Sequence, residues 1–263
     1  MKSILDFARS RQESRPIVLL TAYDVLMARV VARSEADAIL VGDSVAMVVH
    51  GLPSTVHATL EMMCLHTAAV RRGAPDMVVI ADMPFLAARR GVGPAIDAAG
   101  ELMRSGATAV KVEGVGGHED VIAGLVGSGI PVMGHLGLTP QSVNQLGGYR
   151  LQGRSPAEAE RLSAEARRLE ELGAFALVLE CVPAALAARV TGEAAIPTIG
   201  IGAGPDTSGQ VLVLTDLLGL DGSFQPRFSR QYLDGNGAVL GAVNQFARDV
   251  RAARFPARVE VLA

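Results

Sequence analysis

Four carboxylates stand directly after short apolar runs of the chain. They are Asp43 after AILVG, Asp82 after MVVIA, Glu113 after AVKV, and Glu180 after FALVL. A charge beside a buried segment is costly unless it is paired or binds a metal. Oxygen ligands favour Mg²⁺ or another hard cation, and the histidines and cysteines show no zinc spacing. The pattern therefore predicts a divalent cation together with a general acid or base.

Helix capping is the plain alternative for each of these carboxylates. An Asp that follows a strand is often the N-cap of the next helix. Glu is a poor N-cap, however, and Asp82 and Glu180 are each followed by a proline within three residues. Capping by all four is therefore disfavoured.

Lys111 adds a cation to the same set. Strand alternation places Lys111 and Glu113 on one face, with Val110 and Val112 on the other. Two interpretations follow. In the first, Lys111 and Glu113 form a buried ion pair; in the second, Lys111 binds a substrate beside a carboxylate that is linked to a metal. Schiff-base formation by Lys111 is a third possibility. The cluster of carboxylates favours metal chemistry, and the covalent route stays open.

Eight short apolar segments have the composition of parallel strands buried on both faces. They are Ile17 to Tyr23, Ala38 to Asp43, Met77 to Asp82, Ala109 to Glu113, Pro131 to His135, Phe175 to Glu180, Pro197 to Gly202 and Gln210 to Thr215. Helical patterns separate most of them. The alternation predicts an α/β fold, a single (β/α)8 TIM barrel, with an open doubly wound sheet as the alternative. Barrel active sites lie at the C-terminal ends of the strands, where the four carboxylates stand.

Length and composition fit one barrel domain over residues 1–263. The chain has 263 residues, 49% of them hydrophobic, and a formal charge of −3. We expect no nucleic-acid partner and no binding to an anionic membrane. The polar N-terminus has no apolar signal core, no run is long enough to span a bilayer, and the two cysteines form no CxxC pair. These features predict a cytoplasmic protein.

A long stretch after the fifth expected strand, residues 137–155, runs about twenty residues before a convincing helix. Loops of that length are functional or disordered in compact domains. We expect either a lid or cofactor-contact loop, or a surface or subunit-contact loop. His135 ends the strand before it and is either a hydrogen-bonded core residue or a catalytic one.

Several motifs match one known family. They are TAYD, VGDS, HTAAVRRGAP, ADMPF, VKVEG, GHLGLTPQSVNQLGGYRLQGR, LVLECVP and IPTIGIGAG, and they run from residue 21 to residue 204 in the family's order. In these stretches the chain closely resembles the ketopantoate hydroxymethyltransferase (3-methyl-2-oxobutanoate hydroxymethyltransferase) family. The resemblance implies a (β/α)8 barrel that acts in pantothenate, and hence coenzyme A, biosynthesis.

The resemblance also implies the reaction. A hydroxymethyl group would pass from 5,10-methylenetetrahydrofolate to the 2-keto acid 3-methyl-2-oxobutanoate, giving 2-dehydropantoate and tetrahydrofolate. Mg²⁺ would be the cofactor and would stabilise an enolate, and Glu180 of LECVP would be the catalytic base. The assembly would be a homo-oligomer, typically a decamer.

The remaining site residues carry over by motif. Asp43 and Ser44 of VGDS would bind metal and substrate, and Asp82 of ADMPF would bind the metal and help to bind the substrate. In VKVEG, Lys111 would hold the keto acid, and Glu113 would serve the metal directly or through water.

Two positions depart from the family pattern. Ala46 stands where the family usually has Gly, and His57 stands where it usually has Pro, which puts the shape of the loop after the second strand in doubt. The later PRF around Arg227 fits the family, although Lys is more common there. Two other classes of function also stay open: a metal-dependent C–C or P–C bond lyase that works without folate, and a catalytically inactive barrel that serves as a binding or scaffold protein.

Overall fold

Eight parallel strands close into a barrel in this computed structural model, which describes residues 3–257. The strands follow chain order, and β8 pairs with β1, with Ile17 opposite Gly209. They are β1 (Ile17–Thr21), β2 (Ala38–Val41), β3 (Val78–Asp82), β4 (Ala109–Glu113), β5 (Val132–Gly137), β6 (Ala176–Glu180), β7 (Thr198–Ile201) and β8 (Gly209–Leu212). The predicted barrel is confirmed, and the alternative of an open sheet is wrong because no edge strand remains.

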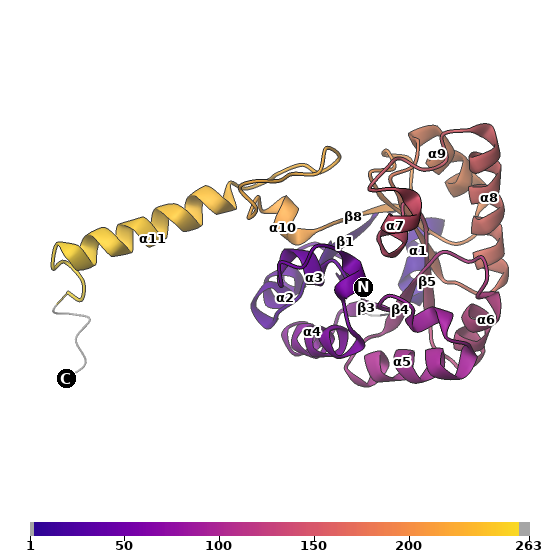
Figure 1. The fold of residues 1–263 in the computed structure, drawn as a ribbon, viewed down its shortest axis with the longest axis horizontal. Helices are drawn as coiled ribbons and strands as arrows, with labels where there is room; N and C mark the ends of the chain where they lie inside the picture. The colour runs from indigo at the N-terminus through magenta and orange to yellow at the C-terminus, as the bar shows by residue number, and fades with distance from the viewer. Residues whose placement is uncertain (1–2, 258–263) are drawn as a thin grey trace. The chain divides into compact units, whose positions relative to one another are not determined.

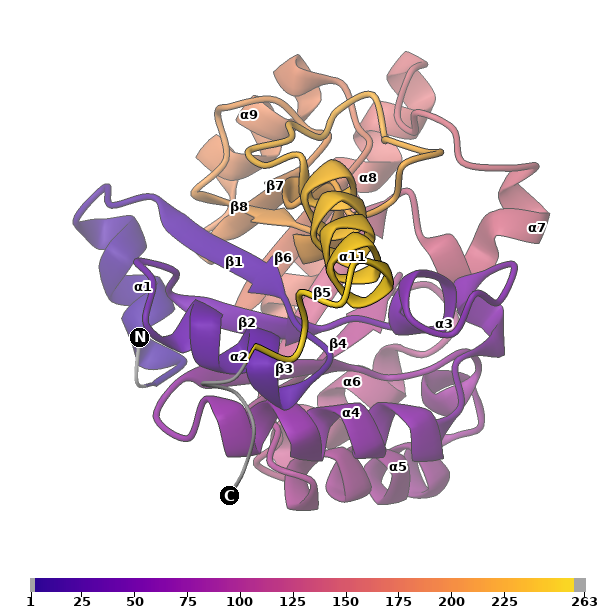
Figure 2. The same ribbon diagram turned by 90° about the vertical axis from the view of Figure 1, so that its left-hand side faces the viewer.

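The barrel lies in the first of two compact units, residues 1–212 and residues 213–263. Its α-helices are α1 (Leu5–Gln12), α2 (Val25–Ala32), α3 (Val45–Val48), α4 (Leu60–Gly73), α5 (Val92–Arg104), α6 (Glu119–Gly127), α7 (Val143–Leu146), α8 (Pro156–Glu171) and α9 (Ala184–Glu193). Short 3-10 turns are η1 (Thr55–His57), η2 (Ala87–Arg89) and η3 (Pro140–Ser142). Neighbouring helices α2, α4, α5 and α6 pack in series around the outside of the strands (Figures 1 and 2).

Alternate residues of each strand fill the barrel interior. The buried cluster takes every second position, including Val78 and Ile80 of β3 and Ala176 and Val178 of β6. At the N-terminal end Phe7 of α1 joins the cluster. The interior is thus a packed core, as expected for this fold, and leaves only the C-terminal ends of the strands for polar side chains.

Local signals explain where the main helices begin. Ser155 and Glu158 form a capping box, with Pro156 as the first residue of α8. The Asp24 side chain accepts from the backbone N–H groups of Leu26 and Met27 at the start of α2. No helix separates β7 from β8.

The second unit contains α10 (Leu214–Leu217) and α11 (Gly235–Arg251). The strand expected over Gln210 to Thr215 ends earlier, at Leu212, because the residues after it close a helical turn: Leu217 N–H donates to the Val213 carbonyl. The final helix, expected from Gly237 to Ala252, is α11. The single domain over residues 1–263 stays a prediction. Within residues 3–257, no helix has the length and apolar character to cross a membrane.

Candidate active site

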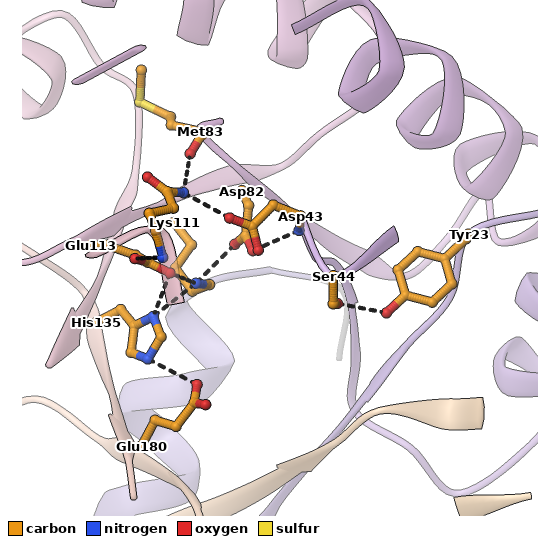
Figure 3. Close-up of polar contacts among 10 residues, drawn as sticks. Tyr23, Asp43, Ser44, Asp82, Met83, Lys111, Glu113, His135 and Glu180 are labelled. Carbon is orange, nitrogen blue, oxygen red and sulfur yellow. Dashed lines mark hydrogen bonds and ion pairs between the residues drawn. The ribbon is translucent and has the colours of Figure 1, made fainter. Parts of the chain in front are cut away.

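Side chains from neighbouring strands meet at the C-terminal end of the barrel. Asp82 continues the inward-facing series of β3, Lys111 and Glu113 that of β4, His135 that of β5, and Glu180 that of β6. Strand register sets Asp82 beside Lys111 and Glu113 beside His135. Figure 3 shows these side chains directed toward one another. The face shared by Lys111 and Glu113 is thus the barrel interior.

None of the four carboxylates singled out in the sequence caps a helix. The N-cap after β2 is Ser44, after β4 it is His118, and after β6 it is Pro183. Leu86 is the N-cap of η2, which follows β3. Helix capping therefore does not explain why these four carboxylates stand at the strand ends.

Lys111 lies at the centre of the cluster. Its Nζ lies 3.1 Å from Asp82 Oδ1, 3.9 Å from Glu113 Oε1 and 3.0 Å from His135 Nδ1. Burial opposes the charge of Lys111, but the carboxylates of Asp82, Glu113 and Asp43 outweigh burial and raise its pKa. A protonated amine cannot attack a carbonyl, which disfavours the Schiff-base alternative.

Asp43 lies one residue beyond the inward series, in the turn that follows β2. Its backbone N–H donates to Asp82 Oδ2 over 3.0 Å. Its own Oδ2 accepts from Gln141 Nε2 over 2.7 Å. Burial, and then the charges of Asp82 and Glu113, raise the pKa of Asp43 well above its usual value. The charged form of Asp43 is therefore disfavoured by its buried position and its negatively charged neighbours.

The charge balance fits a divalent cation. Three buried carboxylates, Asp43, Asp82 and Glu113, outnumber the two basic side chains among them, Lys111 and His135, so the cluster can take a further positive charge. Among residues 3–257, no three or more His, Cys, Asp or Glu side chains form a ready-made metal site. Mg²⁺ nevertheless often takes one or two carboxylates and fills its other positions with water and substrate oxygens. Asp43 and Asp82, joined by their hydrogen bond, fit that requirement.

Glu180 occupies the other side of the cluster from Asp43. Its Oε2 lies 3.2 Å from His135 Nε2, and His135 Nδ1 lies 3.4 Å from Glu113 Oε1. Burial and Lys111 lower the pKa of His135, but hydrogen bonds to Glu113 and Glu180 and the charge of Glu113 outweigh them, so that the pKa is raised. His135 thus connects Glu180 with the rest of the cluster. Glu180, with 16% of its side chain exposed, remains accessible.

Ser44 and Tyr23 form a hydroxyl pair beside Asp43. The Tyr23 hydroxyl lies 2.8 Å from Ser44 Oγ (Figure 3). Burial raises the pKa of Tyr23 above its ordinary value, so the phenol stays neutral. Tyr23 belongs to the TAYD motif and lies just after β1, and that place at a strand end is the sequence signal for its position beside the cluster.

The long stretch after β5 contains η3 and α7 and contacts the cluster at one position that sequence reasoning missed. Gln141 bonds to Asp43, and its backbone N–H donates to Glu113 Oε2 over 3.0 Å. Further along, the Tyr149 hydroxyl lies 3.6 Å from Met47 Sδ in α3. Partial burial and the charges of Asp43, Glu180 and Glu113 raise the pKa of Tyr149. The loop therefore contacts the cluster through Gln141 and carries Tyr149 within the range of its charges.

Ala46 and His57, which differ from the family pattern, both lie between β2 and α4. Ala46 is buried in α3, and His57 ends η1, where its Nδ1 lies 3.1 Å from Ser54 Oγ. Neither takes part in the contacts around Lys111.

A cavity of about 460 Å³ lies at the opposite, N-terminal end of the barrel. Its arginines already have partners. Arg11 donates to Ser208 and to the carbonyls of Thr191 and Ala194, and Arg15 pairs with Asp37. Within residues 3–257, carboxylates and a buried lysine gather only at the C-terminal end of the barrel, so we place the candidate active site there.

Comparison with known proteins identifies relatives along almost the whole chain. Residues 1–258 match the family profile of ketopantoate hydroxymethyltransferase. A 3-methyl-2-oxobutanoate hydroxymethyltransferase of Bdellovibrio bacteriovorus is 49% identical over 260 residues, covering 99% of both chains. An enzyme of the same name from Legionella pneumophila is 49% identical and covers 97% of both chains.

Solved structures with a similar fold are more distant in sequence. A phosphonopyruvate hydrolase, crystallised with oxalate and Mg²⁺, superposes with a TM-score of 0.65 at 13% identity, covering 99% of this chain and 93% of that one. A 2,3-dimethylmalate lyase superposes with a TM-score of 0.60 at 18% identity, covering 100% and 92%. At these identities the likeness supports the barrel fold alone.

Proposed function

The chain belongs to the ketopantoate hydroxymethyltransferase family, and from that premise we propose that it transfers a hydroxymethyl group to 3-methyl-2-oxobutanoate. It is a transferase enzyme, as its curated relatives are. We further propose 5,10-methylenetetrahydrofolate as the donor and 2-dehydropantoate as the product, a step of pantothenate biosynthesis. The observation that carries the proposal is the meeting of Glu180, Lys111 and three buried carboxylates at one barrel end.

Mg²⁺ is the cofactor that this donor set would hold. Asp43 and Asp82 would bind it, with Glu113 serving it directly or through water. When bound, the cation would polarise the keto group and make the C3 proton of the substrate more acidic. Burial raises the pKa of Glu113, but the hydrogen bond to His135 and the charges of His135 and Lys111 outweigh burial and lower it. Glu113 therefore stays ionised, as a group that serves a cation must be.

Three side chains would act on the keto acid itself. Ser44, oriented by Tyr23, would donate a hydrogen bond to the substrate. Lys111, kept protonated by the surrounding carboxylates, would stabilise the negative charge that develops on the enolate oxygen. Glu180 would accept the C3 proton as general base, held in place by His135.

The transfer step balances with one water. The C3 carbon forms a bond to the methylene carbon of the folate, and both carbon–nitrogen bonds of that methylene carbon break. Water supplies the hydroxyl group of the product. The proton taken from C3 and the second water proton replace those bonds on the two folate nitrogens. The folate supplies the one-carbon chemistry, while the protein supplies orientation and electrostatics.

A product assay tests this function. The protein, 3-methyl-2-oxobutanoate, methylenetetrahydrofolate and Mg²⁺ should together give 2-dehydropantoate, detected by mass spectrometry, and omission of any one of them should stop its formation. Cleavage of 2-keto acids without folate would instead indicate a lyase. A folded protein that turns over neither substrate would indicate a scaffold.

Tyr149 offers a prediction about the folate. It is 54% exposed, belongs to the long loop, and is near enough to Asp43, Glu180 and Glu113 for their charges to raise its pKa, so we propose that its ring contacts the flat folate rings. Tyr149→Ala should raise KM for the folate about tenfold, the value of one good aromatic contact. Steady-state kinetics at saturating keto acid provide the measurement.

Tyr149→Phe is the control, because it keeps the ring and loses only the hydroxyl. It should retain a KM near the wild-type value. If the Ala and Phe variants raise KM equally, the hydroxyl rather than the ring matters, and if neither does, the folate binds elsewhere.

We also propose a homo-oligomer, typically a decamer in this family. Apolar side chains at helical spacing along α11 are exposed, which suits a subunit interface. They are Val239, Leu240, Val243, Phe246 and Val250. Light scattering at micromolar concentration should give a mass several times that of one chain. A monomeric mass would contradict the proposal.

A further inference from the structure

We propose that Gln141 is a positioning residue that fixes Asp43 and Glu113 relative to each other, so that the carboxylates are held ready for the cation. The inference rests on the proposed function, and it assigns a role to the inner end of the 137–155 loop. Gln141 is half-buried and touches the two acids from outside the strands that carry them.

Gln141 donates three hydrogen bonds, one to a residue at or just after the end of each of three strands. Its Nε2 donates to Asp43 Oδ2 over 2.7 Å and to the Met83 carbonyl over 2.9 Å. Its backbone N–H donates to Glu113 Oε2 over 3.0 Å. Asp43 follows β2, Met83 follows β3, and Glu113 ends β4. One residue therefore ties together the parts of the barrel that carry the proposed metal ligands.

The loop that carries Gln141 is itself firmly anchored. Leu138 N–H donates to the Glu180 carbonyl over 2.8 Å, and Ser142 N–H donates to the Thr139 carbonyl over 2.8 Å. Gly137 has φ +92°, and a Cβ there would lie 2.2 Å from the Glu180 carbonyl oxygen, so only glycine fits. Pro140 fixes φ at the first position of η3. Gln141 thus acts from a defined backbone position rather than from a free loop.

The chemistry of the side chain suits this role. A carboxamide donates hydrogen bonds to Asp43 but carries no charge, so it orients the carboxylate without competing with a cation, as Lys or Arg would. It also satisfies Oδ2 of a carboxyl that is buried. Partners of this kind around metal ligands are typically worth about 10–100-fold in metal affinity.

Gln141→Met tests the inference, because it keeps the length of the side chain and removes both side-chain donors. We expect Mg²⁺ to bind about 10–100-fold more weakly in calorimetry with 3-methyl-2-oxobutanoate present. Raising the Mg²⁺ concentration should restore much of the lost turnover, which a general loss of structure would not allow. The matched control is Gln152→Met in the same loop, whose side chain donates only to the Arg150 carbonyl in the described contacts. Its Mg²⁺ affinity should equal that of the wild type.

The outcomes separate the inference from the function on which it rests. Wild-type Mg²⁺ affinity in folded Gln141→Met overturns the positioning role and leaves the proposed function intact. Absence of Mg²⁺ binding in the wild-type protein overturns both. If Gln141→Met does not fold by circular dichroism, Gln141→Ala removes the same donors without filling their space, and its Mg²⁺ affinity decides in the same way.

Discussion

Glu180→Gln should slow hydrogen exchange at C3 of 3-methyl-2-oxobutanoate by roughly 10²–10⁴-fold, the usual contribution of a positioned general base. Gln keeps the shape of the side chain but cannot accept the proton. Exchange into D2O, with Mg²⁺ present and folate absent, is followed by proton NMR. The change isolates proton removal, because no later step of the transfer contributes to the signal.

Binding of the keto acid is the internal control for this variant. Asp43, Asp82 and Lys111 remain, so calorimetry should give an affinity near that of the wild type. If exchange persists in Glu180→Gln, the base lies elsewhere, and His135, 3.2 Å from Glu180, is the next candidate. Loss of both exchange and keto acid binding would instead show that Glu180 acts in binding.

Asp82→Asn should weaken Mg²⁺ binding by at least about 10²-fold, since loss of a direct ligand charge should cost no less than loss of an outer partner. Asp43→Asn should act in the same direction. Calorimetry with the keto acid present measures both. Asp97→Asn, an exposed change on α5, is the matched control and should bind Mg²⁺ as the wild type does.

Folding has to be followed in the Asp82 variant. Asp82 also pairs with Lys111 over 3.1 Å, and removing one partner of a buried ion pair often costs about 3–5 kcal/mol. Glu113 remains beside Lys111 and moderates that loss. Circular dichroism should therefore show a folded but less stable barrel. Unchanged Mg²⁺ affinity in both Asp variants would contradict the assignment of the metal ligands.

Much of the fold could be predicted from sequence because parallel strands buried on both faces leave continuous apolar runs. The strands ending at Asp82, Glu113 and Glu180 end in the structure where the sequence places them. The eighth strand was predicted too long, because the apolar residues that follow Leu212 continue the same pattern while forming a helical turn. Composition alone does not distinguish those two conformations over a few residues.

The site was partly predictable for a similar reason. In a closed parallel barrel the C-terminal ends of all strands lie at the same end of the barrel. Asp82, Glu113 and Glu180 could therefore be grouped without knowledge of distances. Gln141 could not, because its bond to Asp43 joins residues 98 positions apart. A neutral polar residue in a polar loop gives no signal of that contact. The bridging place of His135 likewise depends on three-dimensional register.

Hydrogen exchange by the wild-type protein tests the central claim most directly. The claim is that cation-dependent proton removal from the keto acid precedes, and does not need, the folate. In D2O with Mg²⁺ and 3-methyl-2-oxobutanoate alone, the C3 proton signal should disappear, and chelation of Mg²⁺ should stop the loss. Exchange that continues after chelation, together with a borohydride-trapped adduct that Lys111→Ala abolishes, would contradict this account and indicate a Schiff-base aldolase.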